Sequence, residues 1–223
     1  MSPLSFAYLF IFLLWLPSLA IRSHQVLGKG HAIPSRRRLF IQVMLMQALL
    51  AGFSLYVARV YRIPLFPAFE LRLTAVGVAL LVLVPMLATI PMRWRVMKPE
   101  MKRRLMASRP RSWSDMGGWT LISAAAGIGE EISYRGVLFS VLWYYTKSPW
   151  AAAIISAAAF GVAHMTQGWR AGVIIFIFAL AAQWIAWLNG SLYAAMLLHF
   201  SYDVAAGYVY MRLTANDPEA QVA

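Results

Sequence analysis

The sequence predicts an all-α, polytopic membrane protein, a bundle of seven or eight transmembrane helices. Hydrophobic residues make up 61% of the 223 residues, whereas a soluble domain has roughly 45–50%. Apolar runs of about 18 residues or more with few charges recur along the chain, and such runs are typical of membrane-spanning helices. The chain has no cysteine, so disulfide bonds and thiolate chemistry are excluded.

Seven apolar segments are predicted to span the membrane. They are 4–21, 39–58, 71–91, 117–144, 150–164, 171–188 and 191–210. The segment 117–144 is long enough to contain an eighth span or a re-entrant piece. We interpret 4–21 as a retained helix and not as a secretory signal, because no Lys or Arg precedes its long apolar stretch.

Basic residues gather in two connectors: five of the 20 Lys and Arg residues lie in 22–38 and eight lie in 92–116. Two predicted spans separate these connectors, so both are expected on the same side of the membrane. The positive-inside rule makes that side cytoplasmic and places the N-terminus outside. A nucleic-acid patch is the rival interpretation, but no folded domain or interleaved aromatic residues support it. The bilayer is therefore expected as a partner, and nucleic acid is not.

The chain is predicted to be a single membrane domain, 1–223. Three N-terminal spans (1–91) precede a basic cytoplasmic loop (92–116), and a core (117–210) follows. The polar tail after Met211 is expected to fray. The compact length and short loops favour the cytoplasmic (inner) membrane of a prokaryote.

Ionisable residues occur in the interior of the predicted spans only after the basic loop. These residues are Glu130, Glu131, Arg135, His164, His199 and Asp203. An Asp, Lys or Arg at a helix centre costs about 2.5–3.5 kcal/mol on insertion scales, so the sum is comparable with a protein's whole stability of about 5–15 kcal/mol. Such residues face one another or a water-filled cavity, and they mark a functional site.

The spacing of the acidic residues suggests two roles. Glu131 and Arg135 are four residues apart with the acid first, the favoured order for an ion pair in a helix. Glu130 and Tyr134 are also four apart, on a face rotated by about 100°. One carboxylate can thus be neutralised while the other is left for acid–base chemistry. The alternative is that both acids are structural and form hydrogen bonds between helices.

The histidines also occur in pairs four residues apart. Phe160 precedes His164 by four residues, and His199 precedes Asp203 by four. An Asp near a His fixes its tautomer or stabilises its cation. The alternative is that His164 is a satisfied core residue, and that His199 and Asp203 form a polar pair that links helices.

Other hydrolytic classes lack the residues they require. A zinc protease of the HExxH type needs Glu directly after its first His, whereas Met165 and Phe200 follow the histidines here. An intramembrane serine protease needs a Ser in a Gly-flanked turn, but no GxSG is present and Ser133 is expected to face away from Glu130. An aspartyl intramembrane protease needs two buried aspartates, but Asp203 is the sole aspartate within a predicted span. A water-activating Glu with His partners remains, with or without a metal.

Three motifs occur in order on successive predicted helices: EExxxR at 130–135, FxxxH at 160–164 and HxxxN/D at 199–203. With these motifs the sequence resembles the CAAX-protease and bacteriocin-processing (CPBP, or Abi) family of intramembrane endopeptidases, which is related to the Ras-converting CAAX prenyl endopeptidase. The resemblance covers 117–203, and the first three spans match only as hydrophobic helices.

The resemblance implies hydrolysis of a peptide bond in a membrane-anchored peptide or protein. Glu130 would be the general base that takes a proton from water, with the help of His164. His199 and Asp203 would face the developing oxyanion. The supporting residues would be Glu131, Tyr134, Arg135 and Phe160.

The family's roles do not carry over directly at two points, the residue at position 203 and the use of a metal. The Ras-converting branch has Asn where this chain has Asp203, so Asp203 is either protonated or orients His199 as a cation. Glu130, His164 and His199 could also supply three ligands of a catalytic zinc. The family was long described as metalloproteases, whereas the Ras-converting branch looks metal-independent, so no cofactor is favoured and zinc is the alternative.

Two other functions compete with a protease. A proton-coupled transporter also carries Glu, His and Asp chains, but it would be expected to have broken helices in both halves, and the first half here has no buried charge. A non-catalytic membrane scaffold or immunity protein would keep the fold and tolerate Glu130→Gln.

Overall fold

The computed structural model describes all residues except 29–34, 68, 216 and 218–223. The described residues form helices and no strand, which confirms the all-α prediction. The elements are α1 (Pro3–Phe10), the π-helical η1 (Ile11–Trp15), α2 (Leu16–Gly28), α3 (Arg36–Tyr61), α4 (Leu73–Ala88), α5 (Ile90–Arg95), α6 (Pro99–Ser108), α7 (Trp113–Glu130), the π-helical η2 (Glu131–Leu138), α8 (Phe139–Thr146), α9 (Pro149–Ala163), the 3₁₀ helix η3 (Met165–Gln167), α10 (Trp169–Asn189) and α11 (Tyr193–Ala215).

Each of the seven predicted spans corresponds to helical structure. The segments α7, η2 and α8 join into one helix, so the predicted span 117–144 contains no eighth crossing and no re-entrant piece. Within the described part of the chain, four helices are long and apolar enough to cross a membrane. They are Pro3–Val26, Arg36–Tyr61, Leu73–Arg95 and Trp169–Asn189. These helices make the protein an integral membrane protein.

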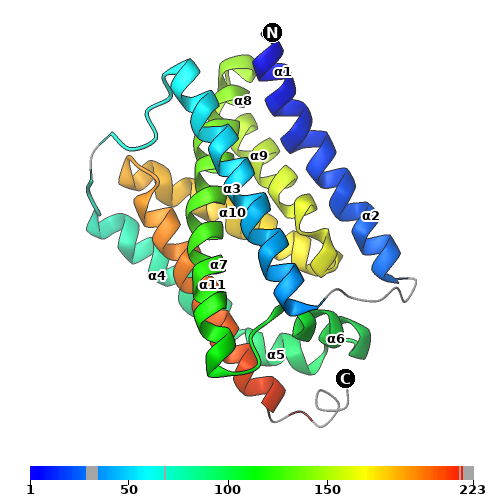
Figure 1. Ribbon diagram of the computed structural model, residues 1–223. Coiled ribbons are helices and arrows are strands. Elements are labelled where there is room, and N and C mark those ends of the chain that lie inside the picture. Colours follow the sequence, from blue (N-terminus) through cyan, green and yellow to red (C-terminus); the bar gives the residue numbers. More distant parts are fainter. Residues whose placement is uncertain (29–34, 68, 216, 218–223) are drawn as a thin grey trace.

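The segment that carries the two adjacent glutamates runs through the middle of the bundle (Figure 1). Helix α7 packs against α3 and α11, and η2 contacts α3, α9 and α10. Helix α2 packs beside α9 at the edge of the bundle, and α4 packs against α10 and α11. The polar side chains of η2 are therefore surrounded by neighbouring helices.

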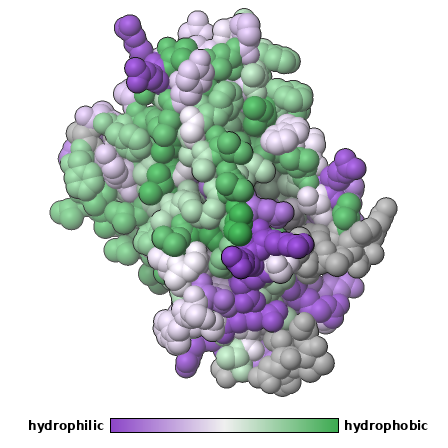
Figure 2. Space-filling model, viewed as in Figure 1, coloured by the Kyte–Doolittle hydropathy of each residue, from purple (hydrophilic) through white to green (hydrophobic). Residues whose placement is uncertain are grey.

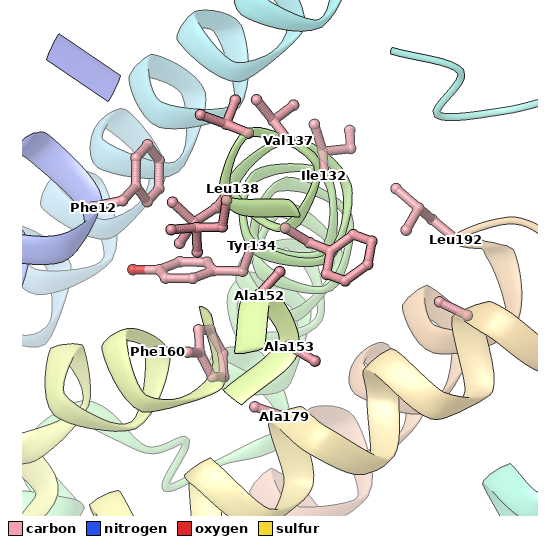
Figure 3. Close-up of a cluster of buried hydrophobic side chains, with 14 of the residues drawn as sticks. Phe12, Ile132, Tyr134, Val137, Leu138, Ala152, Ala153, Phe160, Ala179 and Leu192 are labelled. Carbon is pink, nitrogen blue, oxygen red and sulfur yellow. The ribbon is translucent and has the colours of Figure 1, made fainter. Parts of the chain in front are cut away.

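The main hydrophobic core is built around η2, whose eight residues are all buried. The Tyr134 ring packs edge-on against Phe12 of η1 and Phe160 of α9, with ring centroids 5.2 and 4.8 Å apart. Figure 3 shows these rings together, with Ala152 and Ala153 of α9 nearby. Small alanine side chains allow helices to approach closely, as in other membrane helix interfaces.

The predicted basic loop 92–116 is largely helical. It contains the end of α5 and the whole of α6, whose Leu105 and Met106 are buried in a cluster with Trp94 and Tyr210. Lys98, Glu100 and Arg103 of this region are exposed, and Figure 2 shows hydrophilic residues gathered at the end of the bundle where α5 and α6 lie.

The tail begins later than predicted. Helix α11 continues beyond Met211 to Ala215, and Asp217 then forms an ion pair with Lys102, at 2.9 Å. The remaining tail residues, and Lys29 of the first basic connector, lie outside the described residues.

Close packing of α9 and α10 leads to a first prediction. A Cβ added at Gly161 would lie 2.7 Å from the backbone oxygen of Gly172, so the helices must move apart to accept it. We expect Gly161→Ala to lower the free energy of unfolding by about 1–3 kcal/mol, as overpacking does elsewhere, and so to lower the melting temperature of the purified protein. Gly77→Ala on α4 is the matched control, because nothing lies within 4 Å of its added Cβ. Equal melting temperatures for the two variants would contradict this account.

Candidate active site

The structure brings the predicted base and both histidines together. Oε2 of Glu130, on α7, lies 3.8 Å from Nε2 of His164 and 3.8 Å from Nε2 of His199. Oδ2 of Asp203 lies 3.7 Å from the same His199 nitrogen. The Glu130 side chain is 13% exposed and that of His199 is 7% exposed. Four side chains, from α7, the end of α9 and α11, thus lie close together at one mostly buried point.

The position of His164 follows from the end of α9. The helix closes with a tighter bond from the His164 backbone N–H to the Gly161 oxygen, at 3.2 Å. The carbonyl of Phe160 therefore has no helical partner at this end, as is usual for the last carbonyls of a helix. Nδ1 of His164 lies 2.8 Å from it. Because a carbonyl oxygen only accepts, Nδ1 carries the proton and donates, and Nε2 is left facing Glu130.

His199 is oriented by Glu131. Nδ1 of His199 lies 2.8 Å from Oε1 of Glu131, and this hydrogen bond leaves Nε2 facing Glu130. The sequence left open whether Asp203 fixes the tautomer of His199 or stabilises its cation, and the structure places Asp203 on the opposite, Nε2 side of the ring. The backbone oxygen of Asp203 accepts a hydrogen bond from Nε1 of Trp119, at 2.8 Å. Both histidines thus direct the same kind of nitrogen toward one carboxylate oxygen.

The supporting residues of the motifs are more deeply buried than Glu130 and His164. Nη1 of Arg135 lies 3.2 Å from Oε1 of Glu131, and both side chains are buried. The guanidinium lies over the Phe160 ring, 4.2 Å from its centroid, an arrangement that stabilises a cation. The same ring packs against His164 and Tyr134. Phe160 therefore contacts members of both the acidic and the histidine motifs.

The helix is π-helical where these charges cluster. Residues 131–138 form η2, and single stretches of π-helix are frequent at functional sites. The predicted Glu131–Arg135 pair survives this change of pitch. Ser133 Oγ donates to the backbone oxygen of Gly129, at 2.7 Å, and accepts from Ser54 of α3, at 2.8 Å. Ser133 therefore belongs to a contact between helices.

Sequence reasoning missed Gln47. This residue lies on α3, and its Nε2 donates a hydrogen bond to Oε1 of Glu130. Only ionisable residues were counted within the predicted spans, and a neutral amide escapes that count. The available signal was the pair of amides, Gln42 and Gln47, in the apolar span 39–58, since burying an amide without a partner is unfavourable.

The three candidate zinc ligands are Glu130, His164 and His199, and all three lie at the site. Among the residues that the structure describes, no three His, Cys, Asp or Glu side chains are grouped so as to hold a metal ion. The arrangement is a carboxylate oxygen with two imidazole nitrogens, each 3.8 Å away.

Comparison with known proteins gives one match. Residues 112–205 match the family model described as type II CAAX prenyl endopeptidase Rce1-like. Searches among curated proteins and among solved structures found no significant match. The matched segment starts at α7 and includes every residue of the three motifs, whereas Gln47 and the first three long helices lie before it. The match to the type II CAAX prenyl endopeptidase Rce1-like model agrees with the resemblance that the three motifs indicated.

Proposed function

We propose that the protein is an intramembrane endopeptidase in which Glu130 activates a water molecule to hydrolyse a peptide bond. The observation that carries the proposal is the position of Glu130 Oε2, which is 3.8 Å from Nε2 of both His164 and His199. Distances of this length are too long for direct hydrogen bonds, and Oε2 of Glu130 has no hydrogen-bond partner among the described residues, so a water beside these atoms could bond to it. The match of residues 112–205 to a family of endopeptidases supports the same reaction class.

In the first step, Glu130 takes a proton from the water while the water oxygen attacks the carbonyl carbon of the substrate. His164 carries its proton on Nδ1, so its Nε2 accepts the second hydrogen bond of the water and aligns its lone pair. The carbonyl double bond opens into a tetrahedral intermediate, and its oxygen becomes negatively charged.

His199 would stabilise that negative oxygen. Three carboxylates, of Glu130, Glu131 and Asp203, lie within 4 Å of its ring nitrogens. We assign it a doubly protonated ring that donates Nε2–H to the oxyanion, and a donor held in place in this way supplies a large share of the rate. Asp203 would orient that cation and does not donate itself. Collapse of the intermediate breaks the C–N bond, and Glu130 returns its proton to the leaving amine.

The substrate would be a membrane-anchored peptide or protein, because the site lies between helices of an integral membrane protein. Precursors of secreted peptides and C-terminal sorting tails fit this description. We propose that the N-terminus lies outside and the basic connectors in the cytoplasm, because positive residues favour the cytoplasmic side. The short loops favour the inner membrane of a prokaryote.

The test is cleavage of a reporter panel by the purified protein in lipid vesicles. The panel consists of lipid-anchored peptides with a fluorophore and a quencher, and one member ends in a prenylated CAAX sequence. We expect wild type to cut at least one reporter at a single peptide bond, identified by mass spectrometry, and Glu130→Gln to leave it intact. The same products from both proteins would overturn the proposal.

A chelator tests the role of metal. We expect the cleavage rate of the purified protein to stay within about twofold after treatment with EDTA or 1,10-phenanthroline, because Glu130 and the histidines complete the proposed steps unaided. The measurement is the rate on the same reporter before and after treatment and after added zinc. Loss of cleavage that zinc restores would favour the zinc version, with Glu130, His164 and His199 as ligands.

A further inference from the structure

We propose that Gln47 is a positioning residue for Glu130: it holds one carboxylate oxygen so that the other faces the two histidines. This inference rests on the proposed function, because it concerns the group assigned as the base. It brings α3, which lies before the segment matched by the family model, into the site.

The contact between Gln47 and Glu130 is direct and mostly buried. Nε2 of Gln47 donates to Oε1 of Glu130, and the Gln47 residue is 9% exposed. The approach depends on Gly129, the residue before the base. A Cβ at Gly129 would lie 3.2 Å from Oε1 of Gln47 and 3.3 Å from Cβ of Ala51. The absence of a side chain at Gly129 therefore allows α3 to come close enough for the amide to reach the carboxylate.

The bond divides the two oxygens of Glu130 between two tasks. Oε1 receives the amide hydrogen of Gln47, and Oε2 faces Nε2 of His164 and of His199. A carboxylate without such a partner can rotate and swing away from the water. A neutral amide donor fixes the rotation, and it neither takes up nor releases a proton at any pH that the protein survives. Positioning of this kind matters because small displacements of a catalytic group are costly to rate.

The competing explanation is that Gln47 only links helices, as polar residues do in membranes. Ser54 allows the two explanations to be separated. It lies on the same side of α3 two turns later, is fully buried, and bonds Ser133 of η2 at 2.8 Å, away from Glu130. Ser54→Ala removes a buried contact between the same two helices and leaves the partner of the base untouched.

The kinetic test compares Gln47→Leu with Ser54→Ala on a reporter that wild type cleaves. Leucine has a similar volume but no donor. We expect Gln47→Leu to lower kcat by about 10- to 100-fold with KM changed by less than about threefold, the size expected for a lost hydrogen bond to a charged group. Gln47→Asn keeps the amide one methylene short of its partner and is expected to show an intermediate kcat. Ser54→Ala should keep kcat within about threefold of wild type.

A substrate-independent test measures the contact itself. Melting temperatures are compared for wild type, Gln47→Leu, Glu130→Leu and the double variant, all purified in the same lipid or detergent. Residues in contact give non-additive effects, so we expect the double variant to melt at a higher temperature than the sum of the two single shifts implies. Additive shifts would show that the two side chains do not interact. The inference would then be wrong, regardless of the kcat values of the variants.

These outcomes separate this inference from the proposed function. An active Glu130→Gln protein would overturn the glutamate mechanism, and the inference with it. An inactive Glu130→Gln protein together with wild-type kcat in Gln47→Leu would overturn the role of Gln47 alone. Equal losses of kcat in Gln47→Leu and Ser54→Ala would show a general contact between helices and would also overturn the positioning role.

Discussion

Replacing Glu130 with glutamine is expected to lower kcat by about 10²- to 10⁴-fold, the usual contribution of a general base, while the protein remains folded. Glutamine has the shape of glutamate and still offers an oxygen to Nε2 of Gln47, so the packing around the site is preserved. An amide does not take a proton from water, and the attack of the water would then lack its base. The measurement is kcat on a reporter that wild type cleaves, together with the melting temperature.

Glu100→Gln is the matched control for this variant. It makes the same chemical change at an exposed carboxylate on α6, outside the site, and is expected to keep wild-type kcat. A Glu130→Gln protein that cleaves like wild type, or that replaces wild type fully in cells, would instead favour a non-catalytic scaffold or immunity protein. A folded but inactive variant excludes that rival, because a scaffold has no need of a base.

Local spacing explains why part of the site could be predicted from the sequence. The pair Glu131–Arg135 was expected from four-residue spacing, and the two charges are 3.2 Å apart. The long apolar runs predicted the helices for the same reason, since periodicity and length are properties of a single segment. The basic loop was harder to predict, because α6 is short and has few apolar residues. Its apolar side packs against Trp94 and Tyr210.

Contacts between distant segments could not be predicted in the same way. The hydrogen bond between His199 and Glu131 joins residues 68 positions apart, and that between Gln47 and Glu130 joins residues 83 apart. Which faces of two helices meet depends on crossing geometry and on gaps such as that at Gly129, which helical periodicity does not encode. Local spacing therefore paired His199 with Asp203 and gave no indication of its hydrogen bond to Glu131.

Removing the charge of Arg135 is expected to be the most destabilising change in the protein. Arg135→Met removes the permanent positive charge beside the buried Glu131 carboxylate and leaves it His199 as a charged neighbour, and breaking a buried ion pair on one side costs about 3–5 kcal/mol. Methionine fills much of the same volume, so the loss reflects charge more than packing. The measurement is the melting temperature of the purified variant or, where it fails to accumulate, its yield in membranes. Arg103→Met, at an exposed position on α6, is the control and is expected to melt close to wild type.

The double variant Glu131→Gln/Arg135→Met separates stability from catalysis at this pair. With both charges removed, most of the lost stability is expected to return, because replacing a whole buried pair with neutral residues is often close to neutral. The activity should not return. The amide introduced at position 131 can still accept the Nδ1–H of His199 and hold the ring, but it no longer balances the positive charge that we assign to the ring. A double variant with both stability and kcat restored would show that Glu131 is purely structural, and that Glu130 and Asp203 are enough to sustain His199 as the oxyanion donor.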